Sequence, residues 1–97
     1  MDRKEKFERL LNSRAFKDAM PETQLAMMFE FHTLRELVEK GHVFDVEGAR
    51  MKLGGIAAWS LRRRCRKGQQ SHILLGEQYV FLPSQLKGAI KAVPATA

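Results

Sequence analysis

The chain has 97 residues, of which 44% are hydrophobic and one is cysteine, and its formal net charge is +6. This length allows one small domain, with or without an added helical arm, and the single cysteine excludes a disulfide framework within the chain. No apolar run approaches the roughly 18 residues that span a bilayer, and no signal-peptide core follows the charged first residues, so we expect a cytoplasmic protein without membrane contact.

The charge is unevenly distributed along the chain. Residues 1–48 contain 8 Lys/Arg and 10 Asp/Glu, whereas residues 49–97 contain 9 Lys/Arg and one acidic residue, Glu77. Seven of these nine bases lie between Arg50 and Lys67. Such asymmetry favours a polyanionic partner over the alternative, a basic surface that serves only solubility.

The first 41 residues show the spacing of amphipathic helices. Apolar residues recur at helical intervals over residues 3–19, namely Phe7, Leu10, Leu11 and Phe16. Ser13 can cap a second short turn within this stretch. Another helix is predicted over residues 21–40, because Pro21 suits the first helical position and Gly41 follows the last.

The second predicted helix is apolar on both sides and must therefore bury both. Leu34 and Leu37 lie on one side of its second half, whereas Leu25, Met28 and Phe29 lie on the opposite side of its first half. This second apolar side can be covered by the first helix or by another subunit. We therefore treat Leu25, Met28 and Phe29 as candidate residues for a homodimer or a partner protein.

Two short helices joined by a glycine turn are predicted next, which is the order of a helix-turn-helix. Asp45 is a good N-cap for a helix over residues 46–53, and Gly54-Gly55 ends that helix. After Ile56, a second helix is predicted over residues 57–67, and Gly68 ends it.

The second of these helices is predicted to have one apolar and one basic face. Ala58, Leu61 and Cys65 share the apolar face, so a core role is expected for Cys65 rather than a redox role. The opposite face carries Trp59, Arg62, Arg63 and Arg66, with Arg64 and Lys67 on its flanks. Arginines at this density repel one another in water, and a phosphate backbone removes that repulsion. Arginine also supplies the fork that binds guanine in the major groove.

A hairpin and a last helix complete the pattern. Residues 72–75 and 79–82 are β-rich runs on either side of Gly76-Glu77-Gln78. Ser84 can cap a final helix, in which an apolar stripe comprises Leu86, Ala89, Ile90 and Val93. We expect a mainly α fold with a small β-hairpin: a winged helix-turn-helix domain over residues 42–93, an N-terminal helical region over residues 1–41, and a disordered tail over residues 94–97.

The same residues carry a resemblance to a known family. The segments Val46-Glu47-Gly48-Ala49, Leu53-Gly54, Ser60-Leu61-Arg62-Arg63, Lys67-Gly68 and Leu75-Gly76-Glu77-Gln78-Tyr79-Val80-Phe81-Leu82-Pro83-Ser84-Gln85-Leu86 resemble, in this order, the excisionase/MerR-type winged helix-turn-helix. The resemblance covers residues 43–93. It implies that the arginine helix enters the major groove and that the wing contacts the DNA backbone or the adjacent minor groove.

Two features depart from the family pattern. The turn Gly54-Gly55-Ile56 is one residue longer than usual, which can rotate the second helix. The wing tip carries Glu77 and Gln78 where family members often carry Lys or Arg. A carboxylate near phosphate is unfavourable, so the polar candidates of the wing lie at its base, with Gln69, Gln70 and His72.

These patterns predict a DNA-binding protein, a regulator of transcription or an accessory factor of recombination or partition in a bacterium or mobile element. The candidate DNA-binding residues are Arg50, Lys52, Ala57, Ala58, Trp59, Ser60, Arg62, Arg63, Arg64, Arg66, Lys67 and His72. The alternatives are a protein-binding module or inhibitor with adaptable Met27-Met28-Phe29, and an RNA-binding protein. No motif for catalysis, a metal, a cofactor or a small-molecule substrate is recognisable, so we do not expect an enzyme.

Overall fold

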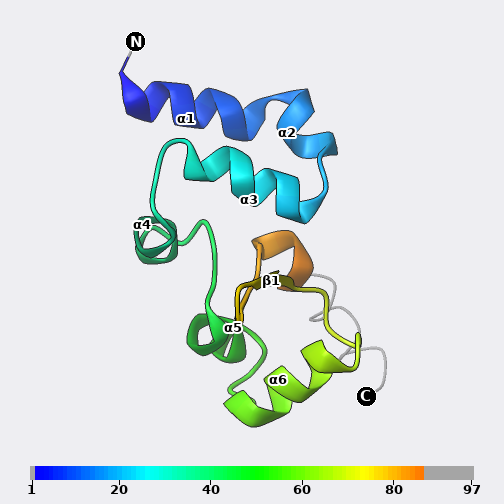
Figure 1. Cartoon of the computed structure of the whole chain (residues 1–97). Coiled ribbons are helices and arrows are strands. Elements are labelled where there is room, and N and C mark those ends of the chain that lie inside the picture. Colours follow the sequence, from blue (N-terminus) through cyan, green and yellow to red (C-terminus); the bar gives the residue numbers. More distant parts are fainter. Residues whose placement is uncertain (1, 87–97) are drawn as a thin grey trace. The chain divides into compact units, whose positions relative to one another are not determined.

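The computed structural model describes residues 2–86 (Figure 1). These residues are mainly helical, with one two-stranded antiparallel sheet. The chain divides into two compact units, Met1–Leu37 and Val38–Ala97. The tail predicted over residues 94–97 and the last helical stripe beyond Leu86 lie outside the described residues. No helix within residues 2–86 has the length and apolar character needed to cross a membrane.

The first unit begins with α1 (Arg3–Asn12) and α2 (Arg14–Asp18) in place of the single helix predicted over residues 3–19. The two helices meet at Ser13, whose hydroxyl accepts a hydrogen bond from the Phe16 N–H at 3.2 Å. The cap predicted at Ser13 is therefore confirmed. Next comes α3 (Pro21–Phe29), which runs beside α1 in the opposite direction (Figure 1). The buried ring of Phe7 packs against Phe31, with ring centroids 5.6 Å apart.

The prediction of a single helix over residues 21–40 is wrong, because α3 ends at Phe29 and α4 (Leu34–Glu39) begins separately. The break is fixed by a reciprocal pair of hydrogen bonds. The Glu36 N–H donates to the Thr33 hydroxyl at 3.2 Å, and the Thr33 N–H donates to the Glu36 carboxylate at 2.9 Å. This is a capping box, which satisfies donors that an uninterrupted helix would have bonded to the preceding turn. The helix with two apolar sides therefore does not form.

The second unit contains α5 (Val46–Lys52), α6 (Ala58–Arg66), β1 (Ile73–Leu75) and β2 (Gln78–Val80). The predicted cap of α5 is confirmed, since the Asp45 carboxylate accepts from the Gly48 N–H at 2.8 Å. Both Gly54 and Gly55 have positive φ, at 88° and 81°, and the Gly55 N–H closes on the Arg50 carbonyl at 2.9 Å. The glycine pair therefore ends α5 and turns the chain towards α6.

The hairpin is tighter than the sequence pattern indicates. Leu75 pairs with Gln78, so two residues, Gly76 and Glu77, form the turn in place of three. Gly76 has a φ of 64°, the positive value that the first central residue of a type II′ turn requires. After β2, Phe81 forms a bridge with Phe44 through two hydrogen bonds of 2.8 Å.

The final helix begins two residues earlier than a cap at Ser84 predicts, since the chain is already helical at Pro83. Its cap is not Ser84. Instead the Gln85 side chain reaches back and accepts from the Leu82 N–H at 2.8 Å. Proline suits the first helical position because its missing N–H would have no partner there.

Candidate nucleic-acid interface

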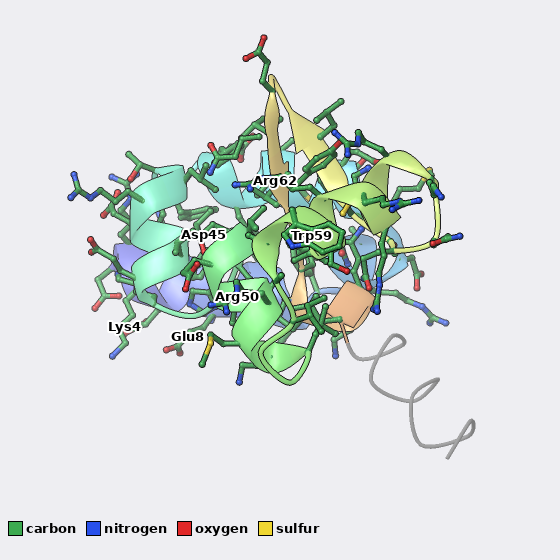
Figure 2. The ribbon with its side chains drawn as sticks, turned by 90° about the horizontal axis from the view of Figure 1, so that it is seen from below. Lys4, Glu8, Asp45, Arg50, Trp59 and Arg62 are labelled. Atoms are coloured by element: carbon green, nitrogen blue, oxygen red, sulfur yellow. The ribbon has the colours of Figure 1, made fainter. Side chains whose placement is uncertain are left out.

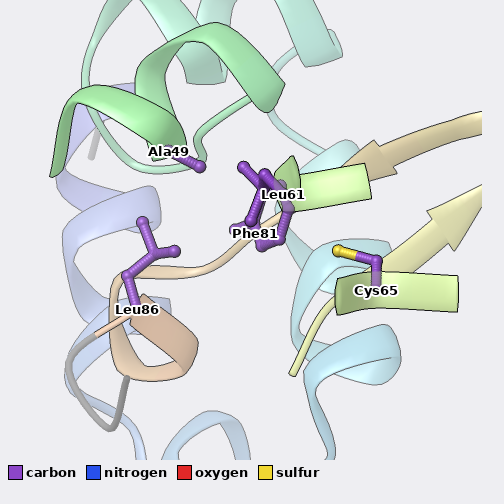
Figure 3. Packing of buried hydrophobic residues seen from close by; sticks show 5 residues of the cluster. All are labelled: Ala49, Leu61, Cys65, Phe81 and Leu86. Carbon is purple, nitrogen blue, oxygen red and sulfur yellow. The ribbon is translucent and has the colours of Figure 1, made fainter. Parts of the chain in front are cut away.

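The helix α6 is held in the second unit by a narrow apolar stripe. Leu61 is fully buried and Cys65 is 3% exposed, in a cluster with Ala49 of α5, Phe81 and Leu86 (Figure 3). Ala58 is half-buried on the same side. The inward face predicted for α6 is thus confirmed.

Cys65 belongs to this core rather than to a reactive site. Its thiol is buried, and desolvation raises its pKa from an ordinary value of 9.0 to about 11. The reactive form of a cysteine is the thiolate, and a raised pKa lowers the thiolate fraction at neutral pH.

The rest of α6 and its C-cap present basic side chains to solvent. The exposed residues are Arg62, Arg63, Arg64, Arg66 and Lys67. Within residues 2–86, no side chain accepts a hydrogen bond from them or pairs with their charges. No acidic residue occurs between Glu47 and Glu77 to neutralise them. The helix therefore concentrates positive charge on one face, near its own C-terminus, where the helix dipole favours cations.

The N-terminal end of α6 completes this surface with apolar and small residues. Trp59 is 67% exposed, and its indole projects from α6 towards the viewer in Figure 2. Ala57 is exposed and Ser60 is half-buried. Ala57 occupies the N-cap position but offers no side-chain hydrogen bond, so the first N–H groups of α6 are not capped by a side chain.

The structure gives Arg50 a bracing position rather than a free one. Its Nε donates to the Ile56 carbonyl at 2.8 Å, and a terminal nitrogen pairs with Glu47 at 2.8 Å. Arg50 thus ties α5 to the turn that precedes α6. Lys52 is exposed, with its ammonium group 5.7 Å from the centre of the Phe44 ring.

The hairpin offers little positive charge. The His72 ring lies edge-on to Tyr79 at 5.1 Å, and its Nδ1 is 2.8 Å from the Gln70 carbonyl oxygen. Leu74 and Leu75 are exposed on β1, and Glu77 is exposed at the tip. The hairpin is therefore apolar and weakly acidic where a phosphate contact would need cations.

Gln70, a polar candidate at the base of the hairpin, has a structural role. It is 4% exposed and donates to the Gln85 carbonyl at 3.3 Å, while the Gln85 amide donates to the Ser71 hydroxyl at 3.1 Å. These hydrogen bonds join the start of the hairpin to the final helix. The sequence indicates polar residues here, Gln69 and Gln70, but does not distinguish the exposed Gln69 from the buried Gln70.

The candidate partner residues of the N-terminal region are mostly inaccessible. Leu25 and Met28 are each 2% exposed, whereas Phe29 is 37% exposed. The first two residues are therefore core residues, and of the three only Phe29 reaches the surface. Within residues 2–86 no three His, Cys, Asp or Glu side chains gather at metal-binding distance.

Comparison with protein-family models, with characterised proteins and with solved structures finds no match to the chain.

Proposed function

We propose that the chain is a DNA-binding protein of the winged helix-turn-helix type, related to the excisionase/MerR-like proteins, and that α6 enters the major groove. The succession α5, glycine turn, α6, hairpin and final helix supports this proposal. Its role would be regulation of transcription, or assistance to recombination or partition.

The observation that carries the proposal is the basic face of α6. Five cationic side chains from Arg62 to Lys67 are exposed, and the helix is held from the opposite side by Leu61 and Cys65. Unpaired arginines on one face repel one another, and this repulsion is relieved when phosphates replace water and counterions. A helix fits the width of the major groove, where arginine can bind guanine O6 and N7 together.

The exposed residues divide by position. Arg63 is four residues after Trp59 and lies with it on the side opposite Leu61 and Cys65, so we assign Arg63 to base contact. Lys67 and the flanking Arg64 are assigned to phosphates. Arg50 is removed from the phosphate contacts, because its guanidinium is occupied within the unit. Phosphate contacts position a protein on the duplex, and base contacts select the sequence.

The test is selection of binding sites from a random duplex pool, followed by affinity measurements at several salt concentrations. Lys67→Ala should weaken binding to selected and random duplexes alike and reduce the salt slope by about 0.9. Arg63→Ala should cost about 1–3 kcal/mol on the selected duplex and relax specificity at one position. Equal losses for both variants on selected and random DNA would contradict the base contact of Arg63.

The same measurements separate the other two functions. Tighter binding to structured RNA than to any duplex would indicate an RNA-binding protein. Absence of binding to every nucleic acid at low salt would favour a protein-binding module. That alternative has lost part of its support, because Met28 is buried.

A further inference from the structure

Trp59 stands out among the side chains that face outward from α6. It is the single tryptophan of the chain and is 67% exposed, on the first turn of a helix whose other outward residues are mainly charged. An indole is one of the largest apolar groups that burial can remove from water, and leaving it exposed forgoes that free energy. In the free protein Trp59 does not contribute to the core.

The neighbours of Trp59 restrict what can cover it. Arg62 and Arg63 follow at i+3 and i+4, so their Cβ atoms lie about 5–6 Å from that of Trp59 on the same helix surface. A partner that buries Trp59 must therefore be apolar where it contacts the indole and anionic or electron-rich around that contact. A duplex major groove has this combination, since the C5-methyl group of thymine is the apolar group among its base-edge contacts.

We infer that Trp59 contacts the methyl group of a thymine close to the guanine bound by Arg63. This inference rests on the proposed DNA-binding function and adds a base preference to it. The separation of about 5–6 Å between neighbouring side chains equals about one to two base-pair steps of 3.4 Å. The thymine therefore lies within two base pairs of the guanine.

The experiment replaces each thymine of the selected duplex by uracil, which removes the methyl group and leaves the hydrogen-bonding edge unchanged. The full chain should lose affinity by about three- to tenfold at one or two positions, the scale expected for one buried methyl group. Trp59→Ala should bind the thymine and uracil duplexes equally. Trp59→Phe should keep the dependence, because it keeps an apolar ring.

Leu74→Ala is the matched control, since Leu74 is a comparably exposed apolar residue, at 59%, on the hairpin. It should keep the wild-type response to uracil. Intrinsic fluorescence provides a second readout, because emission comes from Trp59 at the proposed contact and should change on binding the thymine duplex.

Any of four results would overturn the inference. Uracil could have no effect at any position, or the same effect in Trp59→Ala as in the wild type. Trp59→Phe could lose as much affinity for the thymine duplex as Trp59→Ala, which would assign the contact to the indole N–H. Tighter binding to a single strand than to the duplex would assign Trp59 to base stacking.

The selection separates failure of this inference from failure of the proposed function. If no duplex is enriched, the proposed function itself fails. If a duplex is enriched and Arg63→Ala weakens its binding, the absence of any uracil effect removes the thymine contact alone.

Discussion

The side chain of Arg50 in α5 donates from Nε to the backbone carbonyl of Ile56, at 2.8 Å, across the turn that leads into α6. This hydrogen bond joins α5 to the turn before α6. It does so through the backbone of Ile56, independently of the apolar core. It also engages one of the seven basic residues between Arg50 and Lys67 that the sequence alone assigns to a polyanionic partner.

Replacing Arg50 by lysine tests the hydrogen-bonding geometry of its side chain separately from its charge. Lysine keeps the positive charge but has no Nε–H fork to reach the Ile56 carbonyl while pairing with Glu47. We expect Arg50→Lys to lower the free energy of unfolding by about 1–3 kcal/mol in urea denaturation, the cost of a hydrogen bond lost from a charged donor. The salt slope of DNA binding should be unchanged. A variant as stable as the wild type would show that the bond to Ile56 contributes nothing.

The N-cap of α6 offers the reverse case, a position where stability can be gained. Ala57 has extended backbone angles, with φ −67° and ψ 145°, which suit a capping side chain. Ala57→Ser should raise the free energy of unfolding by about 0.5–2 kcal/mol, because its hydroxyl can accept from an N–H of the first turn.

Ala57→Asp should stabilise the helix as well, since a negative charge is favourable at a helix N-terminus. It should nevertheless weaken DNA binding, because it places a carboxylate beside the phosphates. Ala57→Ser is its control and should leave affinity close to that of the wild type. If Asp and Ser change the affinity equally, Ala57 lies outside the DNA interface.

The capping box of α4 can be tested by mutation and by pH. Thr33→Ala should cost about 0.5–2 kcal/mol of stability at neutral pH, measured by denaturant unfolding. The hydrogen bond from the Thr33 backbone N–H, followed by that from its hydroxyl, lowers the pKa of Glu36 below its ordinary value of 4.5.

A carboxyl group whose pKa is lower in the folded state binds fewer protons there than in the unfolded chain. The contribution of Glu36 to stability is therefore present above its ordinary pKa of 4.5 and is lost as the pH falls through the folded value. Glu36→Gln should remove this part of the acid sensitivity in unfolding curves recorded across that range. An identical pH profile for both proteins would contradict the assignment.

Cys65 gives a pH dependence at the alkaline end. Burial raises the pKa of its thiol from 9.0 to about 11, so the folded state keeps a proton that the unfolded chain releases. Stability should therefore fall as the pH rises from 9.0 towards about 11. Cys65→Ala provides the comparison, since it removes the thiol and leaves every other ionisable side chain in place, and its profile should be flatter. Rapid labelling of native Cys65 by a thiol reagent at neutral pH would contradict the burial.

Much of the second unit could be predicted from the sequence because its signals are local. Asp45 as a cap, the Gly54-Gly55 turn and the apolar stripe of Leu61 and Cys65 all depend on residues within one or two helical turns. The same holds for Ser13 in the first unit. Such signals act through backbone hydrogen bonds that neighbouring residues complete by themselves.

The features that were missed depend on competing or distant interactions. Thr33 and Glu36 have the spacing of a capping box, but the apolar periodicity across them favoured an unbroken helix. The bond from Arg50 to Ile56 and the burial of Gln70 against Gln85 arise only once the chain is folded. A polar side chain looks the same in sequence whether it faces solvent or braces a turn.

The separation of buried and exposed residues within α6 has a consequence for how its binding specificity can change. Only Leu61 and Cys65 of its nine residues are buried. Substitutions at the outward positions therefore leave the core untouched, and single exposed changes typically alter stability by less than about 0.5 kcal/mol. Selection, natural or in the laboratory, can vary what this helix contacts while the way it is anchored stays the same.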